Sequence, residues 1–241
     1  MNAVKNKPEQ PLIVPDTSML MRVLRRLRAS WRIWIIGFAA VLTLGVFLEL
    51  AEDVWMKEGF AWDAPFMLAV HQWRAPWLDV LMIGVTYIGS PGVFVIAPVL
   101  ALWLWRRQLP SAAVTLMVSG LGAALLSSSL KLLFARPRPV VFSPLIAETS
   151  YSFPSGHALN AIAFYGFIAY LLWQQRQRGW AVTTSFFALC ICFSRIYLGV
   201  HYPSDIVGAI SIGLLWLGFV IGGYRHYQAH GVRAHKQPTQ K

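Results

Sequence analysis

The chain has 241 residues, of which 56% are hydrophobic and only 13% are charged. A soluble domain carries about 25% charged residues, so this composition argues against a soluble domain and indicates a membrane protein. The net charge of +11 does not indicate nucleic-acid binding, because the basic residues stand in short clusters between apolar runs. The two cysteines, Cys190 and Cys192, lie two apart in one apolar run and predict no disulfide.

The N-terminal region is expected to precede the membrane domain. Residues 1–17 are polar, contain three prolines and predict a disordered tail. In residues 18–32, apolar side chains recur at helical spacing and five arginines fill other positions. This pattern predicts either a short basic amphipathic helix on an anionic membrane surface or the positive flank of the first span. We assign residues 1–32 to a cytoplasmic tail and amphipathic segment.

Six apolar runs follow, and each is long enough for a transmembrane helix or most of one. The first has 18 residues, which cover about 27 Å as a helix and match the hydrocarbon thickness. A mixed segment, residues 76–89, leads into the second run across Ser90-Pro91-Gly92. The predicted spans are residues 33–50, 93–105, 111–134, 158–173, 180–193 and 206–224. The predicted fold is therefore an all-α, integral membrane bundle of six helices over residues 33–224, followed by a basic tail, residues 225–241.

The distribution of basic residues predicts the orientation of this bundle. With the N-terminus inside, six spans return the C-terminus inside, and 15 of the 21 lysines and arginines fall in inside segments. The positive-inside rule therefore places both termini in the cytoplasm of a bacterial-type inner membrane. The connections after the third and fifth spans then lie on the outer, periplasmic face.

Polar residues collect at span ends on that outer face. Lys131 closes the third span, His157 opens the fourth within P-S-G-H, and Arg195 closes the fifth. The others are Arg136, Arg138, Ser155, Gly156, His201 and Asp205. Taken singly, each has an ordinary interpretation, such as a snorkelling lysine, a head-group contact or a helix cap. If all these interpretations held, unrelated polar residues would have gathered at one face by coincidence. Charges next to lipid are costly and usually functional, so we favour a common site.

The residue types at this face suit phosphoryl transfer. Lys131, Arg138 and Arg195 supply positive charge, while Ser155 and the Gly156 N–H supply further donors to a phosphate. Two histidines allow one to attack phosphorus and the other to protonate the leaving oxygen. An alternative is a metal site of two histidines and one aspartate. The concentrated positive charge disfavours a cation, so we expect no metal and no other cofactor.

These residues form a three-part pattern that resembles the type 2 phosphatidic acid phosphatase (PAP2) superfamily. The family pattern is K-x6-R-P, then P-S-G-H, then S-R-x5-H-x3-D, and this chain matches it in order and spacing. The resemblance implies that His201 is the nucleophile, that Asp205 assists it and that His157 is the general acid. It also implies that the phosphate is held by Lys131, Arg138, Ser155, Gly156 and Arg195. Arg136 stands outside the strict pattern, and we assign it an auxiliary role toward a second phosphate or head group.

The resemblance implies a membrane lipid phosphatase that works through a phosphohistidine, without a metal ion. Undecaprenyl pyrophosphate and phosphatidylglycerol phosphate are the leading expected substrates, with phosphatidic acid and lipid A 1-phosphate behind them. The expected partners are this lipid substrate and the membrane, with no nucleic acid and no obligatory protein partner. A lipid phosphotransferase would use the same residues, so it stays open. A lipid transporter or scramblase is disfavoured because such proteins place charges at the bilayer midplane or on both faces.

Overall fold

The computed structural model describes residues 17–89 and 92–234, and all regular secondary structure in these ranges is helical. The chain divides into two compact units, residues 1–41 and 42–241. In the first unit, the described residues 17–41 are helical throughout and belong to α1 (Thr17–Trp55). Residues 1–16 of the predicted N-terminal tail and residues 235–241 of the basic tail predicted over 225–241 lie outside the described residues, as do most side chains of residues 18–32. Residues 225–234 of that basic tail continue α9 (Pro203–Ala234). The tail and the amphipathic helix therefore stay predictions.

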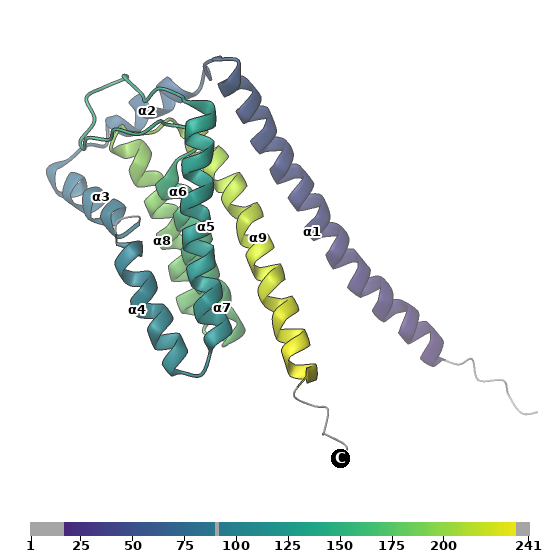
Figure 1. Cartoon of the computed structure of the whole chain (residues 1–241). Helices are drawn as coiled ribbons and strands as arrows, with labels where there is room; N and C mark the ends of the chain where they lie inside the picture. Colours follow the sequence, from purple (N-terminus) through teal and green to yellow (C-terminus); the bar gives the residue numbers. More distant parts are fainter. Residues whose placement is uncertain (1–16, 90–91, 235–241) are drawn as a thin grey trace, which may run out of the picture. The chain divides into compact units, whose positions relative to one another are not determined.

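The second unit contains the end of α1 and all later helices. Figure 1 shows α4, α5, α8 and α9 running lengthwise, with α2 at one end beside the connection from α5 to α6. The helices are α2 (Asp63–His71), α3 (Pro76–Gly89), α4 (Val93–Arg106), α5 (Pro110–Phe134), α6 (Gly156–Asn160), the π-helical turn η1 (Ala161–Tyr165), α7 (Gly166–Gln174), α8 (Arg178–Tyr197) and α9 (Pro203–Ala234).

Five helical stretches are long and apolar enough to cross a membrane, and α3 with α4 would make a sixth if the two form one broken span. The five are Ile33–Trp55, Pro110–Phe134, Gly156–Gln174, Arg178–Tyr197 and Pro203–His230. The predicted spans at 33–50, 111–134, 158–173, 180–193 and 206–224 each lie within one of them. The all-helical, multi-pass membrane architecture is therefore confirmed.

Small residues let the central helices approach closely. A Cβ atom on Gly122 of α5 would lie 2.2 Å from the Trp216 ring of α9, and one on Gly166 of α7 would lie 2.5 Å from Leu217. Ser119 of α5 also donates a hydrogen bond of 2.9 Å to the Ala163 carbonyl. Close backbone approach of this kind is typical of helix packing in membranes. It packs α5 and α7 closely against their neighbours in the bundle that carries the predicted site.

Candidate active site

The predicted site residues meet at one end of the bundle, where α5 and α8 end and α6 and α9 begin (Figure 1). Lys131 and Arg195 lie in the last turns of α5 and α8. His157 lies in the first turn of α6, and Asp205 in the first turn of α9. Residues far apart in the sequence therefore converge, because the C-terminal ends of α5 and α8 lie at the same end of the bundle as the N-terminal ends of α6 and α9.

His201 and Asp205 form a buried pair at the start of α9. His201 Nδ1 lies 3.3 Å from Asp205 Oδ2, and the two side chains are 1% and 0% exposed. Asp205 Oδ2 also accepts a hydrogen bond of 2.9 Å from the Tyr202 N–H, as a carboxylate in the first turn of a helix commonly does. Ser152 Oγ donates to the same carboxylate oxygen and lies 3.4 Å from His201 Nδ1. The imidazole is thus held from its Nδ1 side.

The other imidazole nitrogen faces the cations. Arg138 Nη1 lies 3.4 Å from His201 Nε2. Burial, together with the positive charges of Arg195, Arg138 and Lys131, holds the pKa of His201 well below its ordinary value. A neutral imidazole with Nδ1–H directed at Asp205 leaves the Nε2 lone pair free, which is the form a nucleophile requires.

The two arginines of the A-R-P-R-P segment bind different partners. Ala135 ends α5 in the left-handed conformation, with φ 44° and ψ 34°. Pro137 and Pro139 fix their own φ and disfavour a helix in the residue before each, so the chain continues extended. In a regular β-strand, residues two apart, such as Arg136 and Arg138, would point to the same side. Here the turn after α5 directs Arg136 and Arg138 to different partners.

Arg138 and Lys131 bind the connection between α5 and α6. The Arg138 guanidinium donates to the Ser150 and Val200 carbonyls at 2.7 Å each and to Ser150 Oγ at 3.1 Å. Lys131 Nζ donates to Ser150 Oγ at 2.9 Å and to the Tyr151 carbonyl at 2.7 Å. The two cations are therefore held near His201 largely by neutral oxygen atoms, which leaves much of their charge available to an anion.

Glu148 lies between two of the cations. Its carboxylate accepts a hydrogen bond from Arg195 Nη2 and lies 3.5 Å from Arg138 Nη2. Arg195 has a fully buried side chain and also donates to Thr86 Oγ1 at 2.6 Å, while its Nε has no partner among the described residues. A carboxylate bridging two guanidinium groups occupies a place that suits the oxygens of a phosphate.

The P-S-G-H segment begins α6 as its sequence predicts. Ser155 is the N-cap, and its Oγ accepts a hydrogen bond from the Ala158 N–H at 3.5 Å. A Cβ atom on Gly156 would lie 2.9 Å from Ser127 Oγ, so glycine is needed for the close approach to α5. His157 follows in the first turn, half-buried and within electrostatic range of His201 and the three cations. The free N–H groups of this turn add donors for an anion.

Comparisons with known proteins agree with this geometry. The sequence model of the PAP2 superfamily matches residues 111–227. Phosphatidylglycerophosphatase B of Bacillus subtilis (strain 168) is 35% identical over 186 residues, which cover 74% of this chain and 90% of that protein. The chain belongs to the PAP2 superfamily. An undecaprenyl-diphosphatase of Sulfolobus acidocaldarius is 27% identical, over 78% of this chain and 88% of that protein.

The fold is also shared with solved PAP2 structures. A crystal structure of a transmembrane PAP2-type phosphatidylglycerolphosphate phosphatase from Bacillus subtilis superposes with a TM-score of 0.69 at 30% identity. It covers 78% of this chain and 97% of that one. The crystal structure of Aquifex aeolicus LpxE gives a TM-score of 0.54 at 26% identity, covering 68% of this chain and 96% of that one. The protein is thus a membrane lipid phosphatase of the PAP2 superfamily, a group that acts through a phosphohistidine.

Arg136 lies beside the His201–Asp205 pair, and its guanidinium is paired within the protein. Its side chain is only 10% exposed, and its guanidinium pairs with Asp205 Oδ1 at 2.5 Å and Asp63 Oδ2 at 3.0 Å. The guanidinium carbon also lies 4.3 Å from the centroid of the Tyr202 ring. Both terminal nitrogens are thus paired with buried carboxylates, and the auxiliary role of Arg136 toward a second phosphate or head group stays a prediction.

Sequence reasoning missed several polar residues around the PAP2 motifs. Ser152 stands three residues before the motif serine, and its contact with Asp205 follows from the fold of the loop rather than from any spacing. Glu148 lies in the connection between α5 and α6, and Asp63 begins the short helix α2; both lie between the predicted spans and pair with site arginines. Asp63 and Thr86 precede the matched PAP2 region, so only the folded chain brings them to the site. No local signal identifies these partners.

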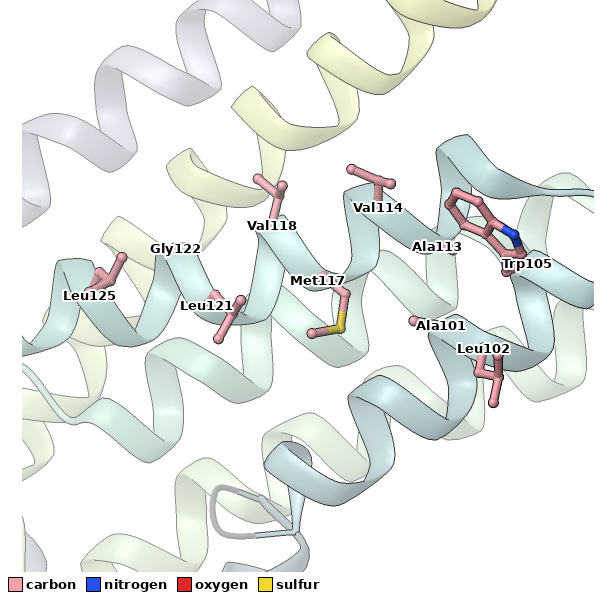
Figure 2. Close-up of a pocket in the computed structure, with 10 residues that line it drawn as sticks. All are labelled: Ala101, Leu102, Trp105, Ala113, Val114, Met117, Val118, Leu121, Gly122 and Leu125. Atoms are coloured by element: carbon pink, nitrogen blue, oxygen red, sulfur yellow. The ribbon is translucent and has the colours of Figure 1, made fainter.

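Among the described residues, neither a cluster of metal-ligand side chains nor the groove between α4 and α5 involves the PAP2 motif residues. Within residues 17–89 and 92–234, no group of three or more His, Cys, Asp or Glu side chains has the geometry to hold a metal ion. An apolar groove of about 590 Å³ lies between α4 and α5, lined by residues such as Leu102, Met117 and Leu125 (Figure 2). It contains none of the motif residues, and its hydrocarbon lining suits acyl chains rather than phosphate chemistry.

Proposed function

We propose that the protein removes the terminal phosphate from a lipid phosphate or pyrophosphate whose tail remains in the bilayer. Phosphatidylglycerol phosphate and undecaprenyl pyrophosphate are the leading substrates, since the relatives named above act on lipids of these two kinds. The observation that carries the proposal is the orientation of His201. Its Nδ1 faces Asp205, while its Nε2 faces Arg138.

In the first step, the terminal phosphate displaces Glu148 from Arg138 and Arg195. His201 Nε2 attacks phosphorus as the bond to the leaving oxygen breaks, and His157 gives its proton to that oxygen. Asp205 holds the Nδ1–H and stabilises the positive charge that forms on the imidazole. The charge on the phosphoryl oxygens is met by Lys131, Arg138, Arg195, the Ser155 hydroxyl and the Gly156 N–H.

In the second step, water attacks the phosphohistidine. The neutral His157 left by the first step accepts a proton from that water while the bond between phosphorus and Nε2 breaks. Inorganic phosphate leaves, and His201 returns to its neutral form. The cycle consumes one water and requires no electron transfer, so the titratable groups of the site are sufficient for it.

The domain boundaries and the topology belong to the same proposal. Residues 33–224 form the six-span phosphatase domain, with α3 and α4 counted as one broken span, and residues 1–32 and 225–241 are cytoplasmic. In the second unit, the connections from α4 to α5 and from α7 to α8 lie at the end opposite the motif residues (Figure 1). They carry Arg106, Arg107, Arg176 and Arg178, so the positive-inside rule places the site at the periplasmic face of an inner membrane.

The test is a panel of lipid phosphates in detergent with EDTA present, comparing wild type with His201→Ala and His157→Ala. The expected result is phosphate release by wild type and an acid-labile phosphoenzyme that is absent from His201→Ala. His226→Ala removes an exposed histidine of α9 and is the matched control, with unchanged activity. Phosphate release by His201→Ala would contradict the mechanism. Activity that EDTA abolishes and zinc restores would favour a metal enzyme.

A further inference from the structure

Arg136 joins two buried carboxylates that come from different parts of the chain. Asp63 begins α2, and Asp205 lies in the first turn of α9. Nη2 of Arg136 pairs with Asp63 Oδ2 at 3.0 Å, and Nη1 pairs with Asp205 Oδ1 at 2.5 Å. The side chains of Asp63 and Asp205 are 4% and 0% exposed. Groups this buried keep their charge only when they are paired and hydrogen-bonded.

The environment of Arg136 fixes the orientation of its guanidinium. Tyr202 lies 4.3 Å and Phe60 5.3 Å from the guanidinium carbon, which restricts rotation of the planar group. Nη1 also donates to Ser204 Oγ at 2.8 Å. Ser204 in turn donates its N–H and its hydroxyl to Asp63, at 2.9 and 2.6 Å. Asp63 therefore fixes Arg136 and the start of α9 at the same time.

This arrangement divides the two oxygens of Asp205 between different tasks. Oδ1 pairs with Arg136, whereas Oδ2 faces His201 Nδ1 and accepts from Ser152 and Tyr202. An unshared guanidinium prefers to bind a carboxylate with both nitrogens, so that both oxygens would turn toward it. Because Asp63 holds the second nitrogen, Arg136 binds Asp205 through one oxygen only. The other oxygen stays on the imidazole.

From this geometry we infer that Asp63, acting through Arg136, is a positioning residue for the His201–Asp205 pair. The inference rests on the proposed function of that pair. Asp63 touches neither the phosphate-binding cations nor His201, so its effect is on the chemical step rather than on phosphate binding. Asp63→Asn lets the guanidinium turn toward Asp205 and compete for Oδ2. Loss of an interaction that orients a reacting group commonly costs on the order of 10- to 100-fold in activity.

The experiment measures steady-state kinetics on phosphatidylglycerol phosphate in detergent, with inorganic phosphate as a competitive inhibitor. For Asp63→Asn we expect kcat to fall about 10- to 100-fold. The inhibition constant for inorganic phosphate should stay within about twofold of wild type, because that constant measures how tightly Lys131, Arg138 and Arg195 bind phosphate. Glu58→Gln is the matched control, since it removes an exposed acid five residues earlier. It should leave both constants unchanged.

A double-mutant cycle separates positioning from a general loss of structure. If Asp63 acts through Asp205, Asp63→Asn adds no further loss in an Asp205→Asn background, whereas a structural defect would lower activity again. Arg136→Lys keeps a charge between the carboxylates but cannot hold both in a fixed plane, so it tests the idea even if Asp63→Asn fails to fold. It should lower kcat at an unchanged phosphate inhibition constant.

The outcomes also distinguish this inference from the proposed function. Wild-type kcat in folded Asp63→Asn or in Arg136→Lys, beside an inactive His201→Ala, would overturn the positioning role alone. Additive losses of Asp63→Asn and Asp205→Asn would do the same. Activity retained by His201→Ala would instead overturn the proposed mechanism, whatever Asp63→Asn does.

Discussion

Glu148 makes the clearest quantitative prediction, because its carboxylate occupies the space between Arg138 and Arg195. The side chain is 23% exposed, whereas that of Arg195 is fully buried. A phosphate group must break this pairing before it binds both guanidinium groups. In Glu148→Gln the side chain keeps its shape and its oxygen but loses its charge, so it becomes a weaker competitor.

The magnitude follows from the exposure of the pair. A partly exposed ion pair contributes about 1 kcal/mol, which corresponds to about a fivefold change in an equilibrium constant. Inorganic phosphate should therefore inhibit Glu148→Gln at about one-fifth of the wild-type concentration. The KM for the lipid substrate should fall in the same direction. The value of kcat should not rise, since Glu148 has left the site before the chemical step.

The assay is competitive inhibition by inorganic phosphate at fixed pH and ionic strength, with Glu58→Gln as a control for the loss of one acidic charge. An unchanged inhibition constant in Glu148→Gln would show that the carboxylate does not compete with phosphate. A weaker affinity would show that Glu148 instead orders Arg195 for binding. Either result would refute the displacement argument.

Three further predictions concern pH, folding and topology. Because the pKa of His201 is held well below its ordinary value, the nucleophile stays neutral as pH falls through about 6.5, so the acid limb of kcat/KM measured against pH should lie below that value. Gly199 has φ +77°, and a Cβ there would lie 2.5 Å from the Phe142 ring, so Gly199→Ala should cost on the order of 1–3 kcal/mol and lower the Tm in detergent. A cysteine at Thr149 should react with an impermeant thiol reagent added outside the cell, and reaction only from the cytoplasmic side would invert the proposed orientation.

The sequence predicted which residues meet, because helix direction and motif spacing are local properties. Lys131, His157 and Arg195 stand at the ends of successive apolar runs, so alternating spans must bring them to one level. The four-residue step from His201 to Asp205 likewise predicts contact across the first turn of a helix. The structure places all five residues at the same end of the bundle and pairs His201 with Asp205.

The sequence did not predict the partners that these residues acquire through tertiary packing. Glu148 and Asp63 lie between the predicted spans, where nothing in the local sequence pattern separates a buried acid from a solvated one. The partners of Arg136 were not predicted for a related reason. Its motif neighbour Arg138 binds beside His201, but the turn after α5 aims Arg136 toward α2. The π-helical turn at Ala161–Tyr165 was also missed, since an apolar run has the same composition in either helical form.

The position of Glu148 has a consequence for the choice among membrane lipids. A phosphodiester head group carries one negative charge, as the Glu148 carboxylate does. Replacing the carboxylate by such a head group between Arg138 and Arg195 therefore gains little electrostatic binding free energy. A phosphate monoester carries about 1.5 to 2 charges near neutral pH and gains more from the same cations. Glu148 should therefore exclude abundant phosphodiesters while admitting terminal phosphates. In mixed micelles, Glu148→Gln should be inhibited by phosphatidylglycerol more strongly than wild type, and equal inhibition of the two would show that charge matching does not set this preference.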